Sequence, residues 1–271
     1  MTSFPPETCC YKGIKHEGTA KGKLSQLSGF EVYTAFPESQ STEKGILILT
    51  DIIGHKFINT QLIADQFAEN GYLVLVPDLF DGDAVPLNRP HGMGMQAWRN
   101  GVHHPQGTAH LPLNIDPIVD ACLAEMRTKY GCKSINTKLT IFYLLPQKIG
   151  AVGYCFGAKY VVRHLNPDVF KIDVGYIAHP SFVTMEELRG IKGPLSIAAA
   201  ETDAIFPAEK RHESEEILKE ISLPYQVNLY GGVTHGFVFA VRGDLKSRAA
   251  LFAKETAFMQ ALQWFRKHLK N

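Results

Sequence analysis

Two unbroken apolar runs on either side of an amphipathic segment constrain the fold of this chain more than any other feature. The runs "GILILT" (45–50) and "GYLVLVPDLF" (71–80) are continuous rather than alternating, which is typical of strands buried on both faces. Between them, residues 58–67 place apolar side chains on one helical face, and Gly71 follows as a stop signal. The pattern predicts a β-α-β unit.

The same alternation continues to the end of the chain. Further strands are predicted at 148–153, 173–180, 195–203 and 225–232, and helices at 117–130, 158–166, 207–221 and 246–268. Strands that alternate with helices imply an α/β fold with a mostly parallel central sheet and helices on both faces. Neither a repeat nor a linker divides the sequence, so we expect residues 1–271 to form a single domain.

The net charge and the hydropathy of the sequence argue against two classes of partner, nucleic acids and membranes. The formal net charge is only +1, and no apolar run approaches the ~20 residues of a membrane span. We therefore expect neither a nucleic-acid partner nor a membrane partner. The start of the chain lacks the apolar core of a signal peptide and the arginines of a transit peptide, so we expect a cytoplasmic protein. The sequence leaves the oligomeric state open.

The five cysteines, at positions 9, 10, 122, 132 and 155, show no pattern of paired spacing. We therefore expect no metal site and no disulfide framework. The neighbouring Cys9 and Cys10 are expected to be ordinary residues of a mobile terminus.

Two segments fit the alternating pattern poorly. Residues 81–116 form a long Gly-, Pro- and His-rich excursion, which is interpreted as a lid or pocket wall or, equally, as a mobile surface loop. Residues 132–147 form an atypical insertion in a place where about 2–6 connecting residues are usual. This insertion is either an extra edge strand or an artefact such as translated intron sequence.

The segment "GYCFG" (153–157) lies where a predicted strand passes into a predicted helix. A Gly-x-nucleophile-x-Gly turn in this context is the nucleophile elbow of α/β-hydrolases. Gly153 and Gly157 leave room for the neighbouring strand and helix, and the helix N-terminus favours the thiolate of Cys155. The pentapeptide alone leaves a second interpretation open, in which Cys155 is a buried small hydrophobe.

Two later residues complete a candidate catalytic triad with Cys155. Asp203 follows it by 48 residues and His235 follows Asp203 by 32, and each stands just past a predicted strand. The order nucleophile, acid, histidine is that of α/β-hydrolases, and the sites of open α/β sheets cluster at the carboxyl ends of strands. Taken singly, Asp203 could cap a helix and His235 could be a hydrogen-bonded loop residue, but their joint order favours the triad.

The chain resembles the dienelactone hydrolase family, and its fungal members most closely. The resemblance is carried by "CCYKGIKHEG" (9–18), "TDIIG" (50–54), "GYLVLVPDLF" (71–80), "GAVGYCFGAKY" (150–160), "ETDAIFP" (201–207) and "VTHGF" (233–237). It implies an α/β-hydrolase fold in which Cys155 is the nucleophile, His235 the general base and acid, and Asp203 the orienting carboxylate. The oxyanion hole would use the backbone N–H groups of Phe156 and Ile52, as their places in the chain also indicate.

The sequence departs from the family at the residue expected to activate the nucleophile. Asp51 stands where family members carry a glutamate that pairs with the resting thiol. It keeps the charge on a side chain one methylene shorter. Asp51 therefore either activates Cys155 or caps the loop that follows it.

A second departure concerns substrate binding. Phe239 occupies the place of an arginine that holds the substrate carboxylate in bacterial members, and Arg242 is the nearest replacement. Trp98 and Phe237 are expected to wall the pocket, although an aromatic side chain is more often part of the core than of a site.

The expected reaction is hydrolysis of a carboxylic ester or lactone through an acyl-thioester on Cys155. The substrate is a small molecule, and no metal or other cofactor is required. Three alternatives remain: a thioesterase or polyketide- or mycotoxin-type esterase with the same triad, a non-catalytic hydrolase-like binding protein, and a redox role for Cys155. The redox role is disfavoured because the sequence shows no resolving cysteine near Cys155.

Overall fold

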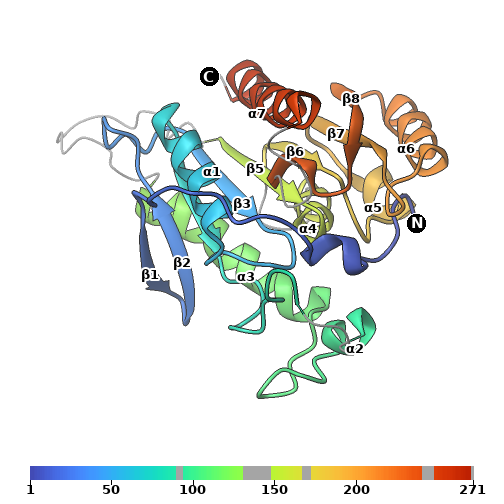
Figure 1. Cartoon of the computed structure of the whole chain (residues 1–271). Helices are drawn as coiled ribbons and strands as arrows, with labels where there is room; N and C mark the ends of the chain where they lie inside the picture. The colour runs from blue at the N-terminus through green and yellow to red at the C-terminus, as the bar shows by residue number, and fades with distance from the viewer. Residues whose placement is uncertain (90–93, 131–147, 167–171, 240–246, 270–271) are drawn as a thin grey trace.

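An eight-stranded sheet in the order β1-β2-β4-β3-β5-β6-β7-β8 forms the centre of the structure (Figure 1). The computed structural model describes residues 1–89, 94–130, 148–166, 172–239 and 247–269. The strands are β1 (Lys23–Leu27), β2 (Phe30–Ala35), β3 (Gly45–Leu49), β4 (Leu73–Pro77), β5 (Ile149–Tyr154), β6 (Val174–Ala178), β7 (Leu195–Thr202) and β8 (Tyr225–Thr234).

Neighbouring strands pair parallel throughout the series β4-β3-β5-β6-β7-β8, whereas at one edge β1 pairs antiparallel with β2 and β2 pairs antiparallel with β4. The predicted mostly parallel α/β sheet is therefore confirmed. The edge hairpin escaped sequence reasoning because "KLSQL" in β1 is exposed at all but its last residue, so it carries no buried-strand signal.

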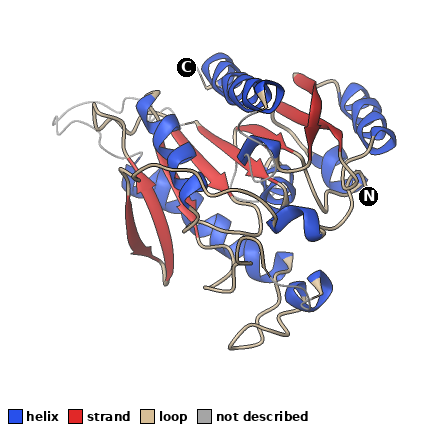
Figure 2. Ribbon diagram, viewed as in Figure 1, coloured by secondary structure: helices blue, strands red, loops and turns tan. Residues whose placement is uncertain are grey.

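The helices are α1 (Ile58–Glu69), α2 (Met95–Arg99), α3 (Pro112–Glu125), α4 (Phe156–His164), α5 (Met185–Gly190), α6 (Ala208–Ile221) and α7 (Arg248–His268). Three short helical turns are also present: η1 (Thr8–Tyr11), η2 (Met126–Tyr130) and η3 (Phe237–Phe239). Figure 2 shows the helices layered around the strands. The predicted helix at 117–130 begins earlier, at Pro112, whose fixed φ suits the first helical turn.

Helices cover both faces of the sheet. A Cβ on Gly150 would lie 2.7 Å from the Phe265 ring of α7. A Cβ on Gly175, in the neighbouring strand, would meet Leu165 and Val161, at the α4 side of the sheet. Gly150 pairs in register with Val174, so Gly150 and Gly175 point to opposite faces. The nucleophile elbow therefore follows β5, a strand in the tightly packed middle of the sheet with helices on both faces.

The excursion at 81–116 is partly helical and partly packed into the protein. Its helix α2 carries Trp98, which is buried and whose ring lies 5.2 Å from that of Phe80 and 5.8 Å from that of Phe156. The Trp98 Nε1–H donates to the carbonyl of Asp83 at 2.7 Å. This part of the excursion is therefore anchored beside the start of α4.

Two sequence predictions fall on positions that the structure does not describe. The insertion at 132–147, with Cys132, and the substrate-binding candidate Arg242 lie outside the described residues. Within the described ranges, no helix combines the length and the apolar character needed to cross a bilayer.

The N-terminal segment is packed against the rest of the chain, contrary to the expectation of a mobile terminus. The N–H groups of Thr2 and Ser3 donate to the carbonyl of Val183 at 2.8 and 3.2 Å, and the N–H of Phe4 donates to that of Ile205 at 2.8 Å. These hydrogen bonds lead the segment to η1, where Cys10 is buried. The terminus thereby becomes part of the surroundings of the elbow.

Candidate active site

Cys155 occupies a strained turn between β5 and α4. Its φ of 47° and ψ of −107° place a non-glycine residue in a sparsely populated region. A Cβ on Gly157 would overlap the Leu49 carbonyl, and a Cβ on Gly153 would lie 2.6 Å from the Cα of Ala158. The two glycines therefore let the turn press against the end of β3 and the first turn of α4.

His235 and Asp203 form a buried ion pair beside this turn. The Nδ1 atom of His235, just past β8, lies 2.8 Å from Oδ2 of Asp203, just past β7. The other oxygen, Oδ1, accepts the N–H groups of Ile205 and Phe206 at 2.8 and 3.0 Å. Asp203 thus fixes its own loop and the ring of His235 together. It does not cap α6, which begins at Ala208 without a side-chain cap.

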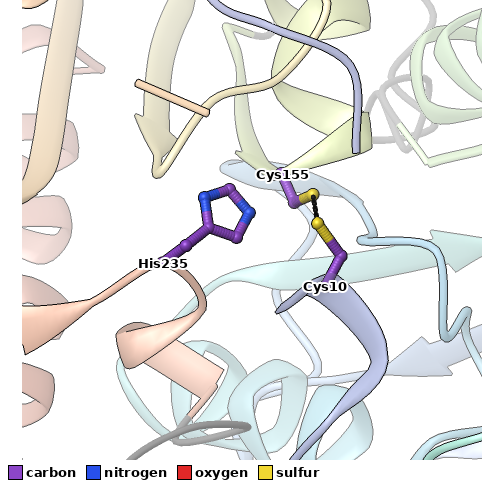
Figure 3. A group of neighbouring side chains, drawn as sticks. All are labelled: Cys10, Cys155 and His235. Carbon is purple, nitrogen blue, oxygen red and sulfur yellow. Dashed lines mark hydrogen bonds between the residues drawn. The ribbon is translucent and has the colours of Figure 1, made fainter. Parts of the chain in front are cut away.

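The ring of His235 faces the sulfur of Cys155. The Sγ atoms of Cys155 and Cys10 and a ring nitrogen of His235 all lie within 4.8 Å of one another (Figure 3). Since Nδ1 is engaged with Asp203, Nε2 is the atom available to exchange a proton with the thiol. All three side chains are buried.

Electrostatics favours a thiolate on Cys155 and an imidazolium on His235. Burial by itself raises the pKa of Cys155, but the hydrogen bond with Cys10 and the charge of His235 outweigh it and hold the pKa well below its usual value. Burial lowers the pKa of His235, but the negative charges of Cys155 and Asp203 raise it well above its usual value. The thiolate and the imidazolium therefore stabilise each other as a buried pair of opposite charges.

The acid of the group stays ionised despite its burial. Burial raises the pKa of Asp203. The charge and hydrogen bond of His235, together with the N–H groups of Phe206 and Ile205, lower that pKa by more than burial raises it, so the net shift is downward. A carboxylate in this position fixes the ring of His235 with Nε2 toward the sulfur.

Cys10 is a member of the site that sequence reasoning missed. Its Sγ lies 3.4 Å from Sγ of Cys155, and it is 3% exposed. Burial first, and then the hydrogen bond with Cys155, raise the pKa of Cys10 well above its usual value. Cys10 therefore keeps its proton and can donate a hydrogen bond to a Cys155 thiolate. The only sequence signal was its place in the fungal-type segment at 9–18, which gives no hint of the contact.

His179 and Ser181 also border the nucleophile and were not predicted. The ring of His179, just past β6, lies 4.8 Å from that of His235, and its pKa is lowered, mainly by burial. The Oγ atom of Ser181 lies 3.6 Å from Sγ of Cys155, and the N–H of Ser181 donates to the Cys155 carbonyl at 3.0 Å. Their place at the carboxyl end of the strand next to β5 was the available signal.

Asp51 lies in the loop after β3, buried near the nucleophile. Its Oδ1 accepts the N–H of Ile53 at 2.9 Å, so the loop-capping interpretation describes its hydrogen bonding. Burial, and then the negative charge of Cys155, raise the pKa of Asp51 to about 7. Asp51 therefore titrates near neutrality within the electrostatic reach of the thiolate.

The loop at 50–54 is held directly against the elbow. The N–H of Gly157 donates to the carbonyl of Thr50 at 2.9 Å, and the carbonyl of Ile52 accepts the N–H of Val85 at 2.8 Å. The N–H of Phe156 is the first of α4, so it has no acceptor within its helix. The structure thus places Ile52 and Phe156 on the two segments that meet at the nucleophile.

The two aromatic candidates for the pocket wall are both buried. Trp98 packs on Phe156 as described above, and Phe237 has its ring 6.1 Å from His179 and 5.2 Å from Tyr230. Both side chains thus pack beside residues of the site.

The parallel sheet, the strained cysteine turn and the His-Asp pair beyond later strands define the class of protein as an α/β-hydrolase. A sequence model of the Dienelactone hydrolase family matches residues 30–269. The chain therefore belongs to the dienelactone hydrolase family and is a hydrolase of that family, as the sequence motifs predicted.

Individual relatives agree with this membership. The chain is 58% identical to Hydrolase tropI of Talaromyces stipitatus over 271 residues, which covers 100% of both chains. It is 47% identical to Hydrolase pyvD of Aspergillus violaceofuscus over 271 residues, again with 100% of both chains covered. A solved structure of a dienelactone hydrolase-like promiscuous phosphotriesterase from metagenomic libraries is similar with a TM-score of 0.66. That match has 13% identity over 92% of this chain and 98% of the other, so it supports the fold alone.

Proposed function

We propose that this protein hydrolyses carboxylic esters or lactones of small molecules through a covalent acyl-thioester on Cys155. The observation that carries the proposal is the arrangement of Cys155 in a strained elbow, facing a histidine whose other nitrogen is paired with Asp203 at 2.8 Å. Nucleophile, base and orienting acid in this arrangement are the elements of acyl transfer.

In the first half of the reaction, the Cys155 thiolate adds to the substrate carbonyl carbon, and the carbonyl electron pair moves to the oxygen. The N–H groups of Phe156 and Ile52 are proposed to stabilise this oxyanion. When the carbonyl re-forms, the bond to the leaving oxygen breaks, and the His235 imidazolium supplies its proton. The product of this half is an acyl-thioester and an alcohol or enol.

In the second half, neutral His235 takes a proton from water, and the hydroxide oxygen adds to the thioester carbonyl. Collapse of this intermediate expels the Cys155 thiolate and releases the carboxylic acid. Asp203 keeps its charge throughout and stabilises the imidazolium in both halves. A thiolate is a better leaving group than an amine, so the same site should favour esters over amides.

We further propose that residues 81–116 contribute a pocket wall, because Trp98 is anchored on Phe156, directly after the nucleophile. Phe237 is proposed to contribute to the same pocket, because its ring lies 6.1 Å from that of His179. Arg242 is the candidate for holding a substrate carboxylate, by virtue of its bidentate fork.

A substrate screen tests the proposed function. We expect turnover of activated aryl esters and lactones, lower rates with thioesters, and no turnover of the matched amides. Rates should be measured with chromogenic substrates, and Cys155 should be labelled in parallel with an iodoacetamide probe at neutral pH. If no substrate class is turned over and Cys155 is not labelled, the chain is instead a hydrolase-like binding protein.

Asp51 is proposed to take part in activating the nucleophile, and Asp51→Asn tests this. The folded-state pKa of about 7 lies above the ordinary value of 3.8. Between these two pH values Asp51 is protonated in the native state but ionised in the unfolded state. The stability that Asp51 contributes is therefore fully present below about pH 4 and is lost as the pH rises through about 7. Each unit of the difference corresponds to about 1.4 kcal/mol.

The Asp51→Asn variant should therefore be more stable than wild type at pH 8 by a few kcal/mol, and should lose this advantage toward pH 4. Urea unfolding at several pH values measures this difference. The acid limb of the pH–rate profile is the functional readout. If that limb is the same in Asp51→Asn and wild type, Asp51 does not activate Cys155.

A further inference from the structure

The reaction proposed above uses Cys10 only as a hydrogen-bond donor to the Cys155 thiolate, and forms no bond to the Cys10 sulfur. Two buried sulfur atoms from opposite parts of the chain lie 3.4 Å apart, and they point toward each other in Figure 3. The sequence disfavoured a redox role for Cys155 because no second cysteine stood near it along the chain. The fold removes that objection, since it brings residue 10 to residue 155.

The N-terminal segment fixes Cys10 in this position from both sides. Before η1, Thr2 and Phe4 are hydrogen-bonded to Val183 and Ile205. After η1, the side chain of Asn88 accepts the N–H of Gly13 at 2.8 Å and donates to its carbonyl at 2.8 Å. The cysteine is therefore held at the nucleophile by hydrogen bonds that do not involve the nucleophile itself.

We propose that Cys10 is a resolving cysteine, and that Cys10 and Cys155 form a site of reversible oxidation by hydroperoxides. The inference rests on the proposed function only in that both use the same reactive sulfur. A disulfide between Cys10 and Cys155 would block the nucleophile, and reduction by thiols would restore it.

The chemistry requires one hydroperoxide and, for reversal, two thiols. The Cys155 thiolate attacks the terminal peroxide oxygen and the O–O bond breaks, so that Cys155 becomes a sulfenic acid. The leaving alkoxide or hydroxide takes a proton from the His235 imidazolium to give an alcohol or water. The sulfur of Cys10, losing its proton, then attacks the sulfenic sulfur of Cys155, and the departing hydroxide leaves as water. Two external thiols, or one dithiol, reduce the disulfide and are themselves oxidised to a disulfide.

The geometry needs only a small movement. An S–S bond is about 2.05 Å long, so the sulfur atoms must approach by about 1.4 Å. Cys10 lies in η1, a single 3-10 turn of four residues, rather than in a long helix or a strand. A shift of this short turn can be made without disturbing the sheet.

The charge states also suit the reaction. Cys155 is held as a thiolate by Cys10 and His235, and the thiolate is the form that attacks peroxides. Cys9 precedes Cys10 in η1, its Sγ lies 3.9 Å from Sγ of Cys10, and its side chain is only partly buried. Cys9 is therefore the matched control for Cys10.

Peroxide treatment of the full-length protein tests the inference. The protein is treated with hydrogen peroxide, alkylated with N-ethylmaleimide, digested without reduction and analysed by mass spectrometry. We expect a peptide pair joined through Cys10 and Cys155 and lighter than the two free thiols by two hydrogen atoms. Dithiothreitol should separate the pair and restore most of the hydrolytic rate lost to peroxide.

The variants sharpen the result, with each rate compared with that of the same untreated variant. In Cys10→Ser, peroxide should drive Cys155 to the sulfinic acid, and dithiothreitol should no longer restore activity. Cys9→Ser should form the cross-link as wild type does. The inference is overturned if wild-type Cys155 becomes sulfinic acid while Cys10 stays free, or if the cross-link joins Cys9 to Cys10. Wild type and Cys9→Ser decide this even if Cys10→Ser does not fold.

The outcome is separable from that of the proposed function, because the cross-link is detected without any substrate. A cross-link in a protein that hydrolyses no ester leaves the oxidation site standing and removes the hydrolytic proposal. Ester hydrolysis by a protein that forms no cross-link supports the hydrolytic proposal and overturns the oxidation site.

Discussion

Replacing Cys155 with alanine should lower kcat for a chromogenic ester by about 10⁴- to 10⁶-fold, the range seen when the nucleophile of an acyl-transfer triad is removed. The variant retains the His235–Asp203 pair but has no atom that can form the acyl-thioester. The Cβ remains within the elbow, so the fold should be preserved. The loss of kcat is measured with stopped assays, using enough enzyme to detect the residual rate.

Cys122→Ala is the control for removing a buried cysteine. Cys122 lies in α3 and is fully buried, and burial raises its pKa, so it should be unreactive. Its replacement should leave kcat within a few-fold of wild type. If Cys155→Ala retained the wild-type rate, the nucleophile would have to be sought elsewhere.

Replacing Gly157 with alanine should destabilise the protein by roughly 3 kcal/mol or more, or prevent folding. The added Cβ would overlap the carbonyl of Leu49 and lie 2.8 Å from that of Thr50. Both obstacles are backbone atoms at the end of β3, so no side-chain rotation relieves the clash. The free energy of unfolding from urea titration is the measurement, with hydrolytic rate as a second readout.

Gly94→Ala is the matched control. Gly94 has a φ of −59°, and a Cβ there would meet no heavy atom of the described residues within 4 Å. The stability change should stay within about 1 kcal/mol. Equal effects at Gly94 and Gly157 would mean that close packing at the elbow is not the reason for its glycine.

The parallel part of the fold was predictable because its strands are buried on both faces. Strands β3 and β4 are fully buried, and an unbroken apolar run is a strong local signal. The β1–β2 hairpin and the short helix α5 lacked such a signal. Helix α5 begins with a capping box between Thr184 and Glu187, which is a short pattern that occurs often outside helices as well.

For the candidate site, the useful signal was the order of residues at strand ends. Cys155, Asp203 and His235 each follow a strand of one parallel sheet, and parallel strands bring their carboxyl ends to one edge. The motif at 50–54 pointed to Asp51 as a candidate, but its hydrogen bond with the N–H of Ile53 and its pKa of about 7 depend on burial in the folded protein, which the sequence does not show.

The sequence by itself determined the α/β class, the family and the residues at the carboxyl ends of β5, β7 and β8, because these depend on local periodicity and on the chain order of strands. Only the tertiary structure decided what surrounds Cys155. Cys10 reaches it across 145 residues of chain, through hydrogen bonds that bind the N-terminal segment to loops after β6 and β7. A contact of that kind leaves no periodic trace in the sequence, since it depends on how separate loops pack once the sheet has formed.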